Sequence, residues 1–205
     1  MARDATLTRS RLLRAGEQRF ARDGVTGARM SDVVRDAGQA NDAAVGYHFG
    51  SRRGLLEAIV AKHVQAMDGQ REVPSRGAGT RALVDAIVRP TANLLATEDG
   101  RDFLRIMEQL ADWSGMSSGH PAPPLRATVI GSQLEALTRR LGDRIGMPLA
   151  RERVALMVVF LTGALAARAR AVESGERQRM AHARFVDHLA DVLTGALTAT
   201  SRQGP

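Results

Sequence analysis

The segment from residue 30 to residue 53 constrains the fold of this chain more than any other part of it. It reads MSDVVRDAGQANDAAVGYHFGSRR. Val33 and Val34 are spaced for the buried face of a short helix, which Gly38 would end. A second short helix that points Val45 and Phe49 inward would follow the glycine turn. Two short helices joined in this way are typical of a helix-turn-helix, a unit that places side chains in the major groove of DNA.

Composition favours an all-α chain with a real core. The 205 residues are 44% hydrophobic and only 3% aromatic, and strand-like alternation is weak. No run of 18 apolar residues is present, so we expect no membrane span. The first ten residues have no apolar leader pattern, and cysteine is absent. We therefore expect a protein of the reducing cytoplasm.

Positive charge is concentrated at the N-terminal end. The net charge is +7, and Lys62 is the only lysine among the 29 basic residues. Residues 1–53 hold ten arginines and six acidic residues, a balance of +4, and residues 54–205 supply the other +3. Arginine suits phosphate recognition, although a GC-rich genome would also enrich it. The distribution indicates a modest electrostatic footprint for nucleic acid.

Apolar periodicity and helix-ending residues predict about nine helices. Their expected ranges are 8–22, 30–37, 41–49, 51–68, 80–96, 101–113, 125–145, 148–173 and 179–199. Pro90 lies inside one range, so we expect a kink and a freed carbonyl one turn earlier. The glycine- and proline-rich stretches 69–79 and 114–124 are expected to be a connector and a loop.

Small and polar residues dominate the outward positions of the second short helix, which would let its backbone approach base edges. Asn41 can pair with adenine or can simply cap the helix. Tyr47 and His48 can contact phosphates, and Arg52 and Arg53 open the next helix, where backbone N–H groups also favour a phosphate. The candidate DNA-binding residues are Arg29, Ser31, Gln39, Asn41, Asp42, Ala43, Gly46, Tyr47, His48, Arg52 and Arg53.

Residues 9–60 resemble the N-terminal DNA-binding domain of the TetR family of transcriptional regulators. The run AGQANDAAVGYHFGSRRGLL is the most specific part, and Leu12, Leu13, Phe20, Gly24 and the segment 32–34 extend the match. The resemblance implies a helix-turn-helix domain over 1–53 and a helical ligand-binding and dimerisation domain over 54–205, with a helix over 51–68 connecting them. It also implies a homodimer that binds a DNA operator.

The chain departs from the usual family pattern at several positions. The turn after Gly38 is one residue longer, and Gly46 stands where the family usually has a tyrosine. Arg29 replaces a frequent small hydroxyl residue, and Arg19 occupies a usually apolar site. Asp42 is acidic and would repel phosphate, although it can accept a hydrogen bond from cytosine.

The last two predicted helices carry wide apolar stripes. The resemblance implies that they pair with their copies in a four-helix dimer interface, although the same stripes would also suit the core of one subunit. The residues expected at the interface are Leu161, Leu165, Phe185, Leu189, Val192 and Leu193.

An effector pocket is implied by the resemblance alone. Met and aromatic side chains can line an adaptable apolar cavity, although each of them is more often plain core. The expected lining is Phe103, Met107, Leu110, Trp113, Met116, Met157 and Phe160.

Motifs for catalysis and metal binding are missing from the sequence. It contains no GxxxxGK[ST], GxGxxG or HExxH pattern, and its five histidines are scattered. We therefore expect no enzyme activity, cofactor or metal. The sequence predicts a transcriptional regulator, most often a repressor, that a small apolar or amphipathic molecule releases from a palindromic operator. The alternative is a helical ligand-binding protein with impaired DNA binding.

Overall fold

The computed structural model describes residues 2–41, 43–73, 75, 77–110, 125 and 127–200. Asp42, Trp113, Met116 and the predicted loop 114–124 lie outside these residues. The described residues form nine α-helices and one 3₁₀ helix: α1 (Ala2–Asp23), α2 (Met30–Asp36), α3 (Ala44–Phe49), α4 (Arg52–Asp68), α5 (Thr80–Ala92), η1 (Asn93–Ala96), α6 (Glu98–Gln109), α7 (Val129–Ile145), α8 (Met147–Glu173) and α9 (His182–Thr198). The expected all-α fold is confirmed.

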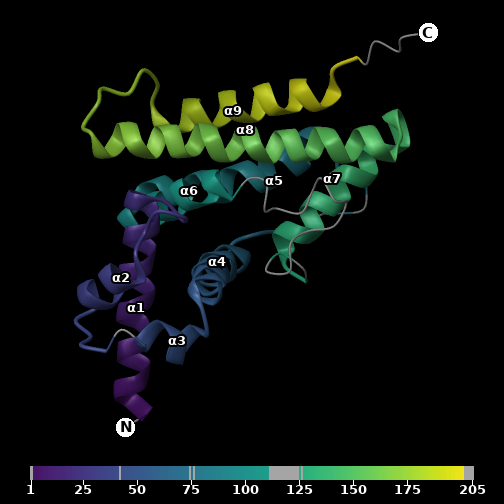
Figure 1. Ribbon diagram of the computed structural model, residues 1–205. Coiled ribbons are helices and arrows are strands. Elements are labelled where there is room, and N and C mark those ends of the chain that lie inside the picture. The colour runs from purple at the N-terminus through teal and green to yellow at the C-terminus, as the bar shows by residue number, and fades with distance from the viewer. Residues whose placement is uncertain are drawn as a thin grey trace.

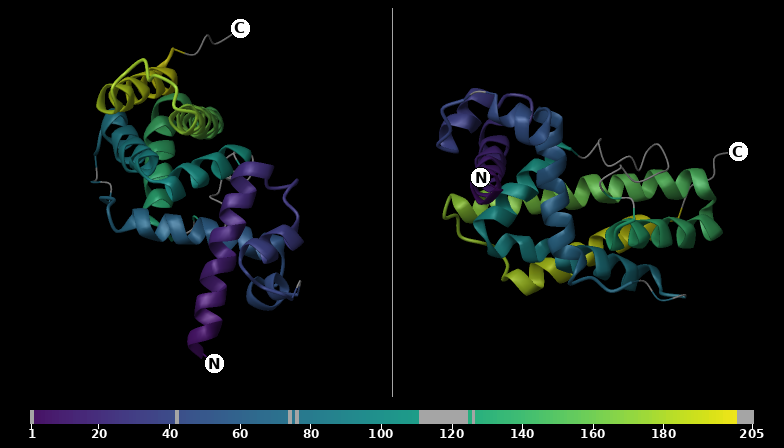
Figure 2. Two further views of the ribbon diagram at one scale, coloured as in Figure 1. Left: turned by 90° about the vertical axis from the view of Figure 1, so that its left-hand side faces the viewer. Right: turned by 90° about the horizontal axis from the view of Figure 1, so that it is seen from below.

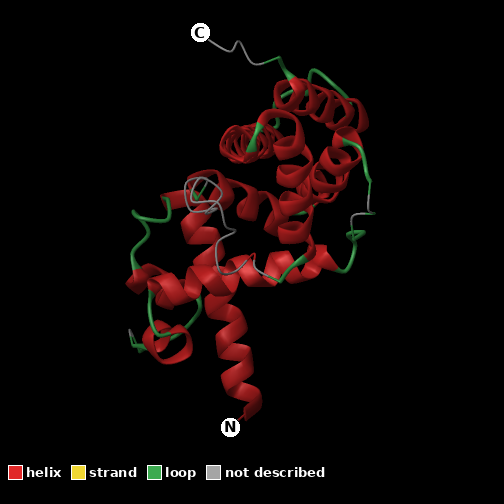
Figure 3. Ribbon diagram, turned by 90° about the vertical axis from the view of Figure 1, so that its right-hand side faces the viewer, coloured by secondary structure: helices red, strands yellow, loops and turns green. Residues whose placement is uncertain are grey.

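The helices form a small N-terminal unit and a larger C-terminal bundle. Helices α2 and α3 pack beside α1 at one end of the molecule, and α8 and α9 run side by side at the other (Figure 1). Figure 2 shows the same separation from two further directions. Figure 3 shows helices and loops as the only kinds of backbone in the described part of the chain. The unit predicted to meet DNA therefore lies far from the last two helices.

Two clusters of buried apolar residues stabilise these two parts, and α6 contributes to both. Leu104 belongs to the cluster built by α5, α7, α8 and α9. Phe103, Ile106 and Leu110 belong to the cluster built by α1, α2, α3 and α4. A single helix of 12 residues therefore forms a wall of both cores.

Hydroxyl caps set two helix starts that periodicity placed three or four residues away. Thr97 accepts a hydrogen bond from the backbone N–H of Gly100 at 3.1 Å, so α6 begins at Glu98. Thr128 accepts one from Gly131 at 3.1 Å, so α7 begins at Val129. Such side-chain acceptors replace the partners that the first helical N–H groups lack.

Pro90 lies inside α5, and the helix continues past it to Ala92 before tightening into η1. Proline has no N–H to donate to the carbonyl four residues earlier, which belongs to Ala86. The Arg71 guanidinium donates to this oxygen instead, from Nη1 at 3.0 Å. The expected freed carbonyl is thus present, and a side chain from another segment satisfies it.

Helix α8 is the longest of the described elements and is rich in apolar residues. By length and composition it could cross a membrane, with a mean hydropathy of 1.6 over the best window, of which 39% is buried. Its buried residues, among them Val154, Leu161 and Leu165, pack in the C-terminal core. Apolar side chains on its remaining surface stay exposed, and they form the patch described below.

Candidate nucleic-acid interface

Glycines shape the turn and the corner that position α3. Gly38 follows α2 with φ +68°, in the left-handed region that side chains rarely adopt. At the corner between α3 and α4, a Cβ on Gly54 would lie 1.9 Å from the carbonyl oxygen of Phe49. Ser51 accepts a hydrogen bond from the Gly54 N–H at 3.0 Å and thereby begins α4. These contacts fix the angle at which α3 leaves the rest of the unit.

Helix α3 buries Val45 and leaves its opposite face open to solvent. Tyr47 is 84% exposed, although tyrosines usually bury most of their ring. Gly46 is also exposed, and a Cβ added to it would meet nothing within 4 Å. His48 is half-buried, and its ring packs edge-on against that of Tyr47 at 4.9 Å. The outer face of α3 is therefore smooth and can approach another surface closely.

Asn41 precedes α3 and does not begin it, which corrects the expected start of this helix. Its Oδ1 accepts a hydrogen bond from the Ala43 N–H at 2.9 Å, and α3 begins at Ala44. This i to i+2 bond is an Asx turn, which extends the linker between the two short helices. The longer turn noted in the sequence is consistent with this extra structure.

The arginines predicted to contact DNA differ in whether their guanidiniums already bond to groups of their own chain. Arg52 donates from Nη1 to the carbonyl oxygens of Val25 and Thr26, at 2.8 and 2.9 Å, so it holds the α1–α2 loop. Arg53 is exposed and pairs with Glu57 at 2.9 Å. Arg29 is exposed at the start of α2. Arg52 therefore positions the unit, and this role was not expected from the sequence.

Two other predicted residues lie nearby on or beside α2. Ser31 is exposed in its first turn, and Gln39 is half-buried, with its amide donating to the Ala37 carbonyl at 3.3 Å. The structure thus places the predicted residues that it describes on α2, α3, the turn between them and the start of α4.

Arg19 fastens α2 to α1, a role that its usually apolar position in the family did not suggest. Its guanidinium donates to Asp36 at 2.5 Å and to Asp23 at 3.1 Å, and lies 3.8 Å from Asp32. The hydrogen bond to Asp36 raises the pKa of Arg19, and the same bond lowers the pKa of Asp36 below its ordinary value of 3.8. Three acidic residues around one arginine were the signal that could have identified this contact.

Helix α6 contacts the N-terminal unit through Gln109 and Phe103, among other residues. Gln109 accepts a hydrogen bond from the Val25 N–H at 2.8 Å and donates to the Phe20 carbonyl at 3.4 Å. Phe103 stacks on His63 of α4 with ring centroids 4.2 Å apart. The position of α6 is therefore tied to the α1–α2 loop and to α4.

A buried carboxylate joins α1 to α4 beside this stack. Glu17 has no exposed surface, and it contacts His63 and, at 2.9 Å, the Lys62 ammonium. Lys62 also lies 3.4 Å from Asp99 of α6, and Arg14 lies 3.0 Å from the same carboxylate. This network joins α1, α4 and α6 through charge as well as packing.

The structure divides the described effector candidates between the two apolar clusters and the surface. Phe103, Met107 and Leu110 pack in the N-terminal cluster, and Met157 is buried in the C-terminal cluster. Phe160 is 51% exposed on the outside of α8. The described members of the predicted set therefore do not all lie together, and the effector pocket stays a prediction.

Four of the predicted interface residues face the interior of the subunit, which corrects that part of the prediction. Leu161, Leu165, Leu189 and Leu193 are each at most 4% exposed. They lie in the core that α8 and α9 share with α5 and α7. The free apolar surface of α8 and α9 therefore lies on a helical face next to the predicted stripe.

The free apolar surface of these two helices is a neighbouring patch, which we call the α8–α9 patch. Leu156, Val159, Phe160 and Val192 form it, with exposures of 58%, 44%, 51% and 40%. Val192 was predicted, and Phe185 is half-buried beneath the Arg168 guanidinium. A groove of about 340 Å³ runs between the two helices at this patch.

No group of three acidic or histidine side chains in the described residues is arranged to hold a metal ion. The conspicuous exposed features of the described chain are thus the α3 face and the α8–α9 patch, at opposite ends of the molecule.

Comparison with known proteins identifies the fold. No protein-family model and no curated protein matches the chain. Among solved structures, GusR from Salmonella enterica is 22% identical, with a TM-score of 0.52 over 94% of this chain and 96% of that one. A transcriptional regulator from Rhodococcus sp. Rha1 is 20% identical, with a TM-score of 0.53 over 96% of this chain and 99% of the other. The chain therefore shares the all-helical fold of these two structures.

Proposed function

We propose that the chain is a cytoplasmic DNA-binding transcriptional regulator of the TetR family. It binds a palindromic operator as a homodimer, acts as a repressor, and releases DNA when a small apolar or amphipathic molecule binds its C-terminal bundle. The observation that carries the proposal is the bare outer face of α3, where Tyr47 is 84% exposed beside the open position of Gly46. A recognition helix needs such a face to reach base edges.

Contacts with DNA divide into two kinds in this proposal. Gly46 and Ala43 let the backbone of α3 approach the base edges, and Asn41 orients the start of the helix. Tyr47 and the exposed guanidiniums of Arg29 and Arg53 contact phosphates, which fix position without reading sequence. Arg52 contributes indirectly, because it holds the α1–α2 loop against the start of α4.

The α8–α9 patch supports the homodimer. Four large apolar side chains are exposed together there, and single soluble subunits seldom expose such a group. A second copy of the same patch would bury them around a two-fold axis, as most homodimers do. Two recognition helices about 34–36 Å apart can then read successive major grooves on one side of the duplex.

Helix α6 supports a route from effector to DNA. It forms part of both cores, and it contacts the α1–α2 loop through Gln109 and α4 through Phe103. A displacement of α6 would shift both contacts and change the separation of the two recognition helices. An effector that weakens operator affinity a hundredfold must prefer the non-binding state by about 2.7 kcal/mol.

A selection experiment tests the DNA-binding proposal. The full chain is incubated with random double-stranded DNA, bound sequences are recovered, and affinity is measured at two salt concentrations. We expect a palindromic sequence, bound more weakly at the higher salt because phosphate contacts release counterions. Tyr47→Ala should weaken binding to all sequences alike. Gln65→Ala changes an exposed residue elsewhere on α4 and should leave binding unchanged.

Binding without sequence preference would contradict the proposal. Steep salt dependence without any sequence preference would contradict a specific regulator and would favour a helical ligand-binding protein with impaired DNA binding. The engagement of Arg52 and Arg53 with groups of their own chain is the observation that favours this alternative.

A further inference from the structure

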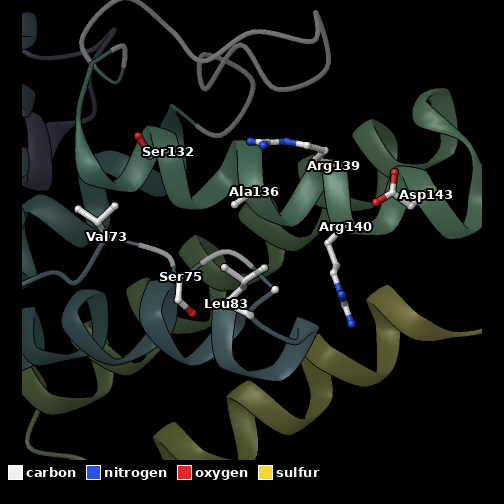
Figure 4. Close-up of a pocket in the computed structure, with 10 residues that line it drawn as sticks. Val73, Ser75, Leu83, Ser132, Ala136, Arg139, Arg140 and Asp143 are labelled. Carbon is white, nitrogen blue, oxygen red and sulfur yellow. The ribbon is translucent and has the colours of Figure 1, made fainter.

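A groove of about 540 Å³ opens between α7, the start of α5 and the connector that follows α4. Its volume lies in the range of about 300–1,000 Å³ that is typical of small-molecule sites. Val73, Ala78, Leu83 and Ala136 give it apolar walls. Figure 4 shows these walls facing one another across the groove, with α7 on one side and the connector and α5 on the other. None of the predicted effector residues that the structure describes lines it.

Two adjacent arginines of α7 give the groove its polarity. Arg139 and Arg140 line it and are exposed, and neither forms a hydrogen bond or an ion pair with another described residue. Figure 4 shows Arg140 reaching from α7 toward the side of α5 and α9, whereas Arg139 lies along α7. Asp143 is the one carboxylate among the described lining residues. The net charge of the described side chains that line the groove is therefore positive.

The two arginines of α5 are paired with acidic residues, whereas Arg139 and Arg140 of α7 are not paired with any described residue. Arg81 pairs with Asp85 at 2.8 Å, and Arg89 pairs with Asp187 at 2.8 Å. A guanidinium without a partner next to an apolar wall suits the carboxylate of an amphipathic molecule, because two parallel N–H groups match its two oxygens.

The connector wall of the groove is tied to both α4 and α7. The Gln133 amide of α7 donates to the Glu72 carbonyl at 3.0 Å, one residue before Val73. Arg71 donates to Gln133 at 3.1 Å, and Asp68 at the end of α4 accepts from the Val129 N–H at 2.9 Å. A molecule bound between the connector and α7 would disturb these hydrogen bonds. Helix α4 joins this region to the N-terminal unit, so a displacement here would reach α3.

We propose that this groove binds a small amphipathic anion, a carboxylate on a short alkyl or aryl chain, with Arg140 holding the carboxylate and Arg139 adding positive charge beside it. The binding follows from the groove itself. Its consequence, a shift of α4 that alters operator affinity, rests on the proposed function.

Calorimetry of the full chain tests the site directly with three probes of equal chain length: octanoate, 1-octanol and octylammonium. We expect octanoate to bind and both other probes to bind at least about fivefold more weakly. The double variant Arg139→Ala/Arg140→Ala should weaken octanoate binding at least about tenfold, because it removes the charge-assisted contacts. Ser132→Trp, at an exposed lining position, should also weaken it by filling the groove.

The control variant is Arg177→Ala, which removes an exposed arginine between α8 and α9 and should leave octanoate affinity within about twofold. Circular dichroism establishes that each variant is folded. Equal affinity for octanoate and 1-octanol, unchanged binding in the double variant, or no octanoate binding by folded wild type overturns the proposal.

Operator affinity measured with and without octanoate separates the two proposals. A loss of the octanoate effect in the double variant, with DNA binding retained, supports regulation through the groove. If wild type binds octanoate through the arginines and binds no DNA sequence specifically, the site stands and the proposed function fails.

Discussion

Removing the Arg71 side chain should destabilise the C-terminal bundle, because among the described residues this guanidinium alone donates to three acceptors there. Arg71 is 7% exposed and donates to Ala86 O at 3.0 Å, Gln133 Oε1 at 3.1 Å and Thr91 Oγ1 at 2.9 Å. Hydrogen bonds from a charged donor contribute about 1.5–3 kcal/mol each. Burial lowers the pKa of Arg71 to about 10 from 12.5. That shift corresponds to a desolvation cost of roughly 3 kcal/mol, which the substitution relieves.

Arg71→Met therefore should lower the free energy of unfolding by about 3 kcal/mol, since the lost bonds outweigh the relief. Urea denaturation followed by circular dichroism measures this difference. Arg144→Met, on exposed surface of α7, is the matched control and should change stability by less than about 0.5 kcal/mol.

Restoring the missing backbone donor at position 90 tests whether Arg71 replaces it. In a Pro90→Ala background, the restored backbone N–H can donate to Ala86 O, so that oxygen no longer depends on Arg71. The double-mutant cycle should then give a coupling energy of about 1 kcal/mol, with Arg71→Met costing less in the Pro90→Ala chain. Additive effects, within about 0.5 kcal/mol, would refute the idea that Arg71 replaces the missing donor.

Three further predictions concern the two ends of the molecule and the junction between them. Phe160→Arg should convert the proposed homodimer to a monomer in analytical ultracentrifugation, because it places charge in the α8–α9 patch; a persisting dimer would contradict that interface. Phe103→Ala should cost about 3–5 kcal/mol of unfolding free energy, because the ring is 2% exposed and stacks on His63, and a cost below 1 kcal/mol would contradict that packing. The bond from Arg19 lowers the pKa of Asp36 below 3.8, so its stabilisation is present above that pH and is lost as the pH falls below it. Thermal unfolding of wild type and Asp36→Asn should therefore converge below pH 3.8, and a constant difference would refute this contribution.

The sequence predicted the elements that rest on local signals. Glycine turns and apolar spacing identified the helix-turn-helix, and the all-α fold followed from periodicity. The free carbonyl at Ala86 followed from Pro90, but its partner did not, because Arg71 lies 15 residues away and reaches it only in the folded chain.

Side-chain placement on wide apolar helices was the part that the sequence could not determine. Leu161 and Phe160 are neighbours on α8, yet one is buried and the other is half-exposed. A stripe that covers two faces does not say which face meets a partner. Likewise, the contacts of Arg52 with Val25 and Thr26 depend on tertiary structure that no local pattern contains.

Lys62 places a single reactive amine at the junction between the two cores. It is the only lysine of the chain, and its ammonium lies between Glu17 of α1 and Asp99 of α6. On a chain whose terminal amine is blocked, an amine-reactive reagent therefore has one side chain to modify. The rate of that modification reports how tightly α1, α4 and α6 are closed on one another, without any engineered label.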